Sequence, residues 1–184
     1  MPLFKSSQEK RYWLFASLVL IAILSTLTLG QPLQRLLIDQ NIQAAIFMLG
    51  MLLTGVVIVI HGLKVQPSKT EIIFWIGLIA VYLMLFLRLG IPERSHLIEY
   101  SVLSIFIHKA LIERLSSNSQ FFKPALMAFI ITCLIGIFDE AIQYFLPQRV
   151  FDWEDILFNT LAAFMAIGGS LILQWAKRKF SNPN

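Results

Sequence analysis

The sequence predicts an all-α protein, a polytopic membrane bundle of about six transmembrane helices with the N- and C-termini in the cytoplasm. Of its 184 residues, 57% are hydrophobic and only 14% are charged, whereas about 25% of residues are charged in an ordinary soluble domain. Long uncharged stretches alternate with short segments that contain charges or proline. No repeat and no long linker divides the chain, so residues 1–184 are expected to form a single transmembrane domain.

Three segments are long enough to cross a bilayer without help. Residues 12–34 include 23 positions without a charge, residues 40–63 include 24, and residues 156–176 include 21. A transmembrane helix needs about 20 apolar residues. We therefore expect a membrane-spanning helix in each of them.

Three further segments are apolar but shorter or interrupted by charges: residues 72–87, 97–112 and 124–146. At about 1.5 Å per residue, the first two would span only about 24 Å. The long side chains of Arg88 and Lys109 would have to extend towards the membrane surface for these segments to cross. Turns are expected at residues 30–35, 64–69, 89–95, 116–124 and 146–149, most of which contain proline.

The distribution of basic residues favours six spans. If all six segments cross and the N-terminus is cytoplasmic, 11 of the 15 Lys and Arg residues lie on the cytoplasmic side, as the positive-inside rule requires. If residues 97–112 do not cross, the count becomes six inside against nine outside. We therefore expect a multi-pass membrane protein with both termini on the cytoplasmic side.

Most acidic residues fall on the opposite, outer side in this topology. Eight of the 11 Asp and Glu residues lie there or in the outer ends of helices, although acidic residues contribute little to orientation. His96, Glu99 and Tyr100 are spaced at i, i+3 and i+4, so they share one helical face. Asp139 and Gln143, four residues apart, mark a second polar face.

Glu140 lies three residues before Gln143 and belongs to this second face. A third polar face carries Asp152, Asp155 and Asn159 at i, i+3 and i+7, if the last helix begins near Asp152. A charged side chain that faces lipid costs several kcal/mol, so the three faces should turn towards one another. The sequence therefore predicts an outward-facing polar site between the outer ends of the last three helices.

The segments "ERSHLIEY" and "FDEAIQYFLPQRVFDWEDILFNTLAA" resemble the VanZ-like family, bacterial membrane proteins named for one linked to teicoplanin resistance. The resemblance covers residues 92–166. The family patterns H-x-x-E-Y, D-E-x-x-Q, P-x-R and D-x-x-x-N fall here on His96, Glu99, Tyr100, Asp139, Glu140, Gln143, Pro147, Arg149, Asp155 and Asn159. The chain departs from the family at Gln148, where glycine is common, and at Ala162-Ala163, where the family often has a glycine.

The resemblance implies a place in the bacterial cytoplasmic membrane and a role in the cell envelope, with a link to glycopeptide resistance, but supplies no reaction. In the first of two readings, Arg94, Arg149 and His96 hold the phosphate or carboxylate of an amphipathic ligand, a membrane lipid or a lipid-linked wall precursor. The candidate ligand-binding residues are Arg94, Tyr100, Glu140, Gln143, Arg149, Asp152, Asp155 and Asn159.

In the second reading the protein is a membrane-embedded enzyme, with Glu99 or Asp139 as general base and His96 as acid partner. A proton-coupled transporter is a third, weaker reading, because the acids line only one side of the membrane. No cofactor is expected, although the carboxylates with Asn159 could hold Mg²⁺ or Ca²⁺, or His96 with Glu99 another divalent ion. Nucleic acid is not an expected partner, since the net charge of +4 comes from cytoplasmic anchors that suit anionic lipid.

Overall fold

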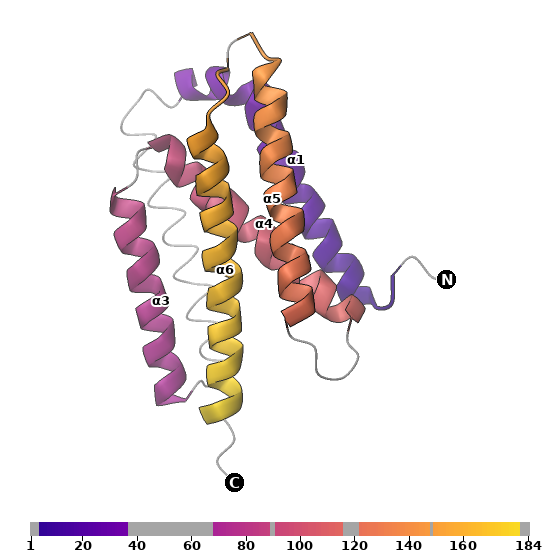
Figure 1. Ribbon diagram of the computed structural model, residues 1–184, viewed down its shortest axis with the longest axis vertical. Coiled ribbons are helices and arrows are strands. Elements are labelled where there is room, and N and C mark those ends of the chain that lie inside the picture. Colours follow the sequence, from indigo (N-terminus) through magenta and orange to yellow (C-terminus); the bar gives the residue numbers. More distant parts are fainter. Residues whose placement is uncertain (1–3, 37–67, 89–90, 116–121, 148, 181–184) are drawn as a thin grey trace.

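The computed structural model describes residues 4–36, 68–88, 91–115, 122–147 and 149–180. All regular structure within these residues is helical, as the sequence predicts, and Figure 1 shows its arrangement. The five helices are α1 (Ser7–Leu36), α3 (Lys69–Arg88), α4 (Ile91–Leu115), α5 (Phe122–Tyr144) and α6 (Trp153–Phe180). The helix expected at residues 40–63 lies outside the described residues.

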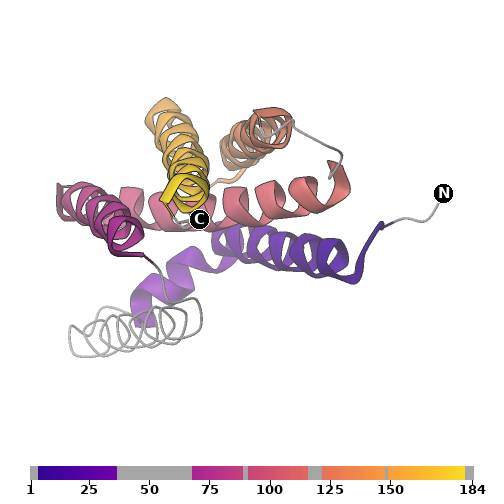
Figure 2. The ribbon, with the colours of Figure 1, turned by 90° about the horizontal axis from the view of Figure 1, so that it is seen from below.

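Helix α4 lies at the centre of this bundle. It contacts α1 on one side and α5 and α6 on the other, while α3 packs against α6 (Figure 2). Leu103 and Ile107 of α4 are fully buried, and small side chains of the neighbouring helices, Ala128 and Ala162, pack in the same core. Small residues let helix backbones approach closely, which is how helices associate when the hydrophobic effect between them is weak.

The helix directions alternate, so polar segments that are distant in sequence meet at one end of the bundle. Helices α1, α3 and α5 begin at the end where α4 and α6 finish (Figure 1). The start of α4, the end of α5 and the start of α6 therefore lie together at the opposite end. These are the segments that carry the three predicted polar faces.

Helices α1 and α3 begin with serine caps. The Glu9 N–H donates to Ser6 Oγ at 3.0 Å, and the Glu71 N–H donates to Ser68 Oγ at 3.3 Å. In α3 the Ser68 N–H returns a bond to the Glu71 carboxylate, which completes a capping box. Glu9 is fully buried, and its Oε1 accepts a hydrogen bond from Arg114 at 3.2 Å, which fastens the start of α1 to the end of α4.

Three helical segments are long and apolar enough to cross a membrane: Ser7–Leu27, Phe122–Tyr144 and Trp153–Lys179. Many large apolar side chains are exposed on the helices, among them Ile73 and Ile137. Such a surface is suited to lipid rather than to water. The all-helical fold and these spans indicate a membrane protein.

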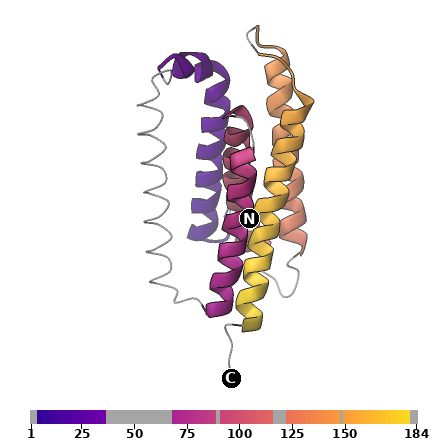
Figure 3. The same ribbon diagram turned by 90° about the vertical axis from the view of Figure 1, so that its left-hand side faces the viewer.

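The expected turn at residues 30–35 is wrong, because α1 continues to Leu36. Pro32 lies inside the helix, where a proline removes one backbone hydrogen bond and bends the axis instead of ending the helix. Figures 1 and 3 show the last part of α1 turned aside from its main axis.

Helices α3 and α4 are longer than their predicted segments. They contain 20 and 25 residues, or about 30 and 37 Å at 1.5 Å per residue. The expected turn at residues 89–95 is too long, because α4 begins at Ile91 and Pro92 is tolerated in the first turn of a helix. Helix α5 ends at Tyr144, two residues before the predicted boundary.

Candidate functional site

The start of α4 contributes an aromatic pair. The rings of His96 and Tyr100 stack with centroids 6.2 Å apart and planes inclined by 22°. Tyr100 is fully buried, and its hydroxyl donates to Asp139 Oδ2 on α5 at 3.1 Å. Glu99, which is half-buried on the same helix, interacts electrostatically with His96 and Asp139.

The last turns of α5 contribute Asp139, Glu140 and Gln143, all of which are buried. Gln143 Nε2 donates to Glu140 Oε1 at 2.7 Å, and the backbone N–H of Asp152 donates to Glu140 Oε2 at 3.2 Å. Both oxygens of Glu140 are thus oriented by hydrogen bonds. The second of these bonds ties the end of α5 to the segment before α6.

The start of α6 holds the imidazole ring of His96 from two positions one turn apart. Asn159 Oδ1 lies 2.9 Å from His96 Nδ1, and Asp155 Oδ2 lies 3.5 Å from His96 Nε2. The side chain of Asp152 is exposed and caps α6 by accepting the Glu154 N–H at 2.8 Å. Helix α6 begins at Trp153, one residue after the predicted start.

Gly136 allows α5 to approach both neighbouring helices at this level. A Cβ atom at Gly136 would lie 3.1 Å from Asn159 Cβ and 3.4 Å from Tyr100 Cε1. The first distance is shorter than ordinary van der Waals contact. The glycine therefore provides the space in which the side chains of α4, α5 and α6 meet.

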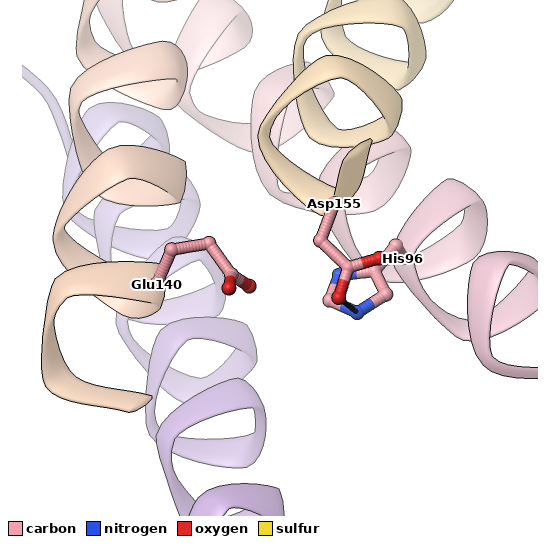
Figure 4. Close-up of side chains that lie close together, drawn as sticks. All are labelled: His96, Glu140 and Asp155. Atoms are coloured by element: carbon pink, nitrogen blue, oxygen red, sulfur yellow. Dashed lines mark ion pairs between the residues drawn. The ribbon is translucent and has the colours of Figure 1, made fainter. Parts of the chain in front are cut away.

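These contacts define one polar cluster, which consists of His96, Tyr100, Asp139, Glu140, Gln143, Asp155 and Asn159. Figure 4 shows Glu140 extending from α5 towards His96 of α4 and Asp155 of α6. One potential ligand atom from each of these three side chains lies within 4.8 Å of the other two. The three predicted polar faces are therefore brought together at one end of the bundle.

Two buried atoms of the polar cluster have no hydrogen-bond partner within the part of the chain that the structure describes. They are Oδ1 of Asp139, a residue that is 3% exposed, and Nδ2 of Asn159, a residue that is 1% exposed. A buried polar group without a partner costs about 1–3 kcal/mol. The cluster therefore offers one acceptor and one donor that an additional molecule could satisfy.

Two arginines, Arg94 and Arg149, are expected from the sequence to bind a ligand. Arg149 is half-buried and donates through Nη2 to the backbone carbonyl of Thr26 on α1 at 2.8 Å, and it also interacts electrostatically with Asp139. Its guanidinium group thus fastens the α5–α6 connection to α1. The side chain of Arg94 lies outside the described residues.

The sequence reasoning missed a second polar feature, which runs down α4 from the polar cluster. Ser104 and His108 follow His96 and Tyr100 at steps of four residues, and both are buried. Neither ring nitrogen of His108 has a hydrogen-bond partner among the described residues. The regular four-residue spacing was the signal that could have revealed this stripe.

Comparison with known families covers most of the chain. The family model described as VanZ/LLP1 matches residues 12–174. This match extends well beyond residues 92–166, over which the motifs resemble the family, and includes most of α1 and all of α3. No curated protein and no solved structure shows a significant match. The chain belongs to the VanZ/LLP1 family.

Proposed function

We propose that this protein is a six-helix, multi-pass protein of the bacterial cytoplasmic membrane, with both termini in the cytoplasm and the polar cluster facing outward. The basic residues Lys10, Lys69 and Lys177 lie near the start of α1, at the start of α3 and in the last turn of α6. These helix ends share one end of the bundle, opposite the polar cluster. Basic residues mark the cytoplasmic side of membrane proteins, so this distribution supports the orientation.

Exposed aromatic residues support a position of the polar cluster near the membrane–water interface. Tyr144 and Phe145 at the end of α5 are 70% and 81% exposed, and Trp153 at the start of α6 is 64% exposed. Aromatic side chains, Trp and Tyr above all, are enriched at the level of the lipid head groups. His96 and Asp139 each lie five residues from a helix end, or about 7 Å, which is within reach of a head group.

The ligand we propose is the polar head of an amphipathic molecule, a membrane lipid or a lipid-linked wall precursor, whose tail lies in the bilayer. The observation that carries this proposal is a pair of buried atoms, Asp139 Oδ1 and Asn159 Nδ2, for which the described residues provide no hydrogen-bond partner. A hydroxyl or amide of a head group can donate to the first and accept from the second. The exposed apolar surface of the adjacent helices would accommodate the tail.

A membrane-embedded enzyme is the second candidate, and the position of His96 favours it. Its ring is held between Asn159 and Asp155, and a histidine oriented by a carboxylate is a suitable general acid or base. Glu99 and Asp139 would then be the further acid–base groups in contact with the head group. The proposed link to teicoplanin resistance fits either candidate, because both place a wall precursor at the outer surface.

Native mass spectrometry of the detergent-purified protein tests the binding proposal. We expect a phospholipid or polyprenyl-phosphate adduct on the wild type, and its loss in Asp139→Asn and Arg149→Ala. Arg114→Ala is the matched control for Arg149→Ala, since Arg114 also donates a hydrogen bond to α1 but lies at the other end of the bundle. An adduct that is absent from the wild type, or equally abundant in all variants, would contradict the proposal.

Incubation with the lipid identified in this way separates the two candidates. A binding protein leaves the mass of the lipid unchanged, whereas an enzyme converts it to a product that depends on His96. Teicoplanin susceptibility of cells that express the wild type or Asp139→Asn then tests the proposed link to resistance. Equal susceptibility of the two strains and of a strain without the protein would contradict that link.

A further inference from the structure

The hydrogen bond to Asn159 determines which nitrogen of His96 can bind a ligand. The carboxamide oxygen of Asn159 faces His96 Nδ1 at 2.9 Å, and this oxygen can only accept. Nδ1 therefore carries the proton, and a neutral ring presents the lone pair of Nε2. That lone pair faces Oδ2 of Asp155 at 3.5 Å, an arrangement that is repulsive unless a proton or another cation lies between them, and a carboxylate oxygen of Glu140 lies within 4.8 Å of a ring nitrogen of His96.

The carboxyl groups around the ring also outnumber the basic groups among the described residues. Glu99, Asp139, Glu140 and Asp155 interact electrostatically with one another or with His96. Among the described residues, the basic groups that act on them are His96 and Arg149. If all four carboxyl groups were ionised, they would exceed these two basic groups by two charges even with His96 protonated. An uncompensated charge inside a protein costs several kcal/mol, so the cluster favours either protons or a bound cation between its carboxyl groups.

We propose that His96 Nε2, one oxygen of Glu140 and one oxygen of Asp155 bind a divalent transition-metal ion of the Mn²⁺ or Zn²⁺ type. Ligand atoms about 2.1 Å from such an ion lie about 3–4 Å apart. The present separations of up to 4.8 Å close to that range by small side-chain rotations. One imidazole with two carboxylates is a mixed donor set suited to these ions rather than to Ca²⁺.

The partners of the three ligands fit this role. Metal-binding histidines usually donate their other ring N–H to an oxygen that fixes the tautomer and the ring orientation, as His96 does with Asn159. Gln143 and the Asp152 N–H orient Glu140. The carboxyl group of Asp139 interacts electrostatically with His96 and Asp155. Its Oδ1, which has no partner among the described residues, can accept a hydrogen bond from water on the ion.

This inference rests on the proposed function, because the ion would attract the anionic group of the head group to a cluster that is otherwise rich in carboxylates. With three protein ligands the ion keeps open positions, as metal ions that contact a substrate do. The metal would thus explain how an acidic site can bind a phosphate. It also makes Asp155 and Glu140 metal ligands, a role that Glu99 does not share.

Titration of the chelator-treated, full-length protein with Mn²⁺, followed by electron paramagnetic resonance, tests the metal site. We expect one tightly bound Mn²⁺ per chain, with magnetic coupling to one imidazole nitrogen. Asp155→Asn should weaken binding at least 10-fold, and Asn159→Ala should weaken it about 10–100-fold through the orientation of His96. Glu154→Gln removes the same charge from the neighbouring exposed position and should leave the affinity unchanged.

The proposal is overturned if no Mn²⁺ binds stoichiometrically, if the nitrogen coupling is absent, or if Asp155→Asn and Glu154→Gln bind alike. His96→Gln replaces Asp155→Asn if the latter does not fold. The lipid adduct is measured separately on metal-free protein and on Mn²⁺-loaded protein. An adduct without metal binding refutes the metal site alone, whereas metal binding without any adduct refutes the proposed ligand.

Discussion

Removal of the Tyr100 hydroxyl should destabilise the protein more than the loss of an ordinary hydrogen bond between neutral groups does. Tyr100 is fully buried, and its hydroxyl is the donor to Asp139 Oδ2 at 3.1 Å. The other carboxylate oxygen, Oδ1, has no partner among the described residues. Tyr100→Phe would therefore leave both oxygens of a buried carboxyl group unpaired. Since hydrogen bonds to charged groups contribute about 1.5–3 kcal/mol, we expect the free energy of unfolding to fall by about 2–3 kcal/mol.

Tyr82→Phe is the matched control, because it removes the same atom from a different environment. The Tyr82 hydroxyl lies 3.3 Å from Ser101 Oγ, which is a neutral partner. Ser101 is also within hydrogen-bonding distance of the Ala162 carbonyl, at 3.4 Å. Loss of a hydrogen bond between neutral groups costs about 0.5–1.5 kcal/mol. The two substitutions should therefore differ by at least about 1 kcal/mol.

Unfolding by sodium dodecyl sulfate in mixed micelles measures both free energies under one condition. A double-mutant cycle with Asp139→Leu isolates the interaction itself, because replacing both partners by apolar groups can be nearly neutral. We expect the double variant Tyr100→Phe/Asp139→Leu to be more stable than the sum of the single effects predicts. Equal effects of Tyr100→Phe and Tyr82→Phe, or strict additivity in the cycle, would refute the reasoning.

Two other substitutions have defined outcomes. Gly136→Ala should be less stable than Gly168→Ala by about 1–3 kcal/mol in the same unfolding assay. The Cβ at position 136 would press on Asn159, whereas the Cβ at position 168 would meet nothing within 4 Å. Equal stabilities of the two variants would contradict the close approach of α5. Glu9→Ala should lower the free energy of unfolding by about 1–3 kcal/mol, because it removes the buried acceptor for Arg114. It should leave the lipid adduct intact, and loss of the adduct would show that the two ends of the bundle are coupled.

The polar faces were predictable because helical spacing depends only on position in the chain. His96 and Tyr100, or Asp155 and Asn159, are four residues apart, so each pair must share a face wherever the helices lie. The cost of a charge in lipid then requires that these faces meet. Both arguments need only the sequence and the properties of a bilayer.

The specific pairings could not be predicted, because they depend on how the helices cross. The sequence groups His96 with Glu99 on one helix, whereas the ring of His96 is held by Asp155 and Asn159 of α6. The bond that Arg149 donates to the backbone carbonyl of Thr26 was not predictable either, because every residue carries such a carbonyl. Spacing along one helix carries no information about contacts with another.

Helix ends were the least predictable part of the fold, and proline is the reason. Pro32 lies within α1 and Pro92 lies in the first turn of α4, although both were expected in turns. A proline at the first turn of a helix costs nothing, and one inside an apolar helix bends it without ending it. A proline in the sequence can therefore mark a turn, the first turn of a helix or a bend inside a helix.

Cysteine labelling in intact cells tests most directly that the polar cluster faces outward. In a Cys133→Ala background, which has no other cysteine, Val150→Cys places a thiol in the connection between α5 and α6, where Val150 is 84% exposed. Lys177→Cys places one in the exposed last turn of α6, at the other end of the bundle. A membrane-impermeant maleimide should label Val150→Cys in intact cells and Lys177→Cys only after lysis. The reverse pattern would place the polar cluster at the cytoplasmic face and contradict the proposed role at the outer surface.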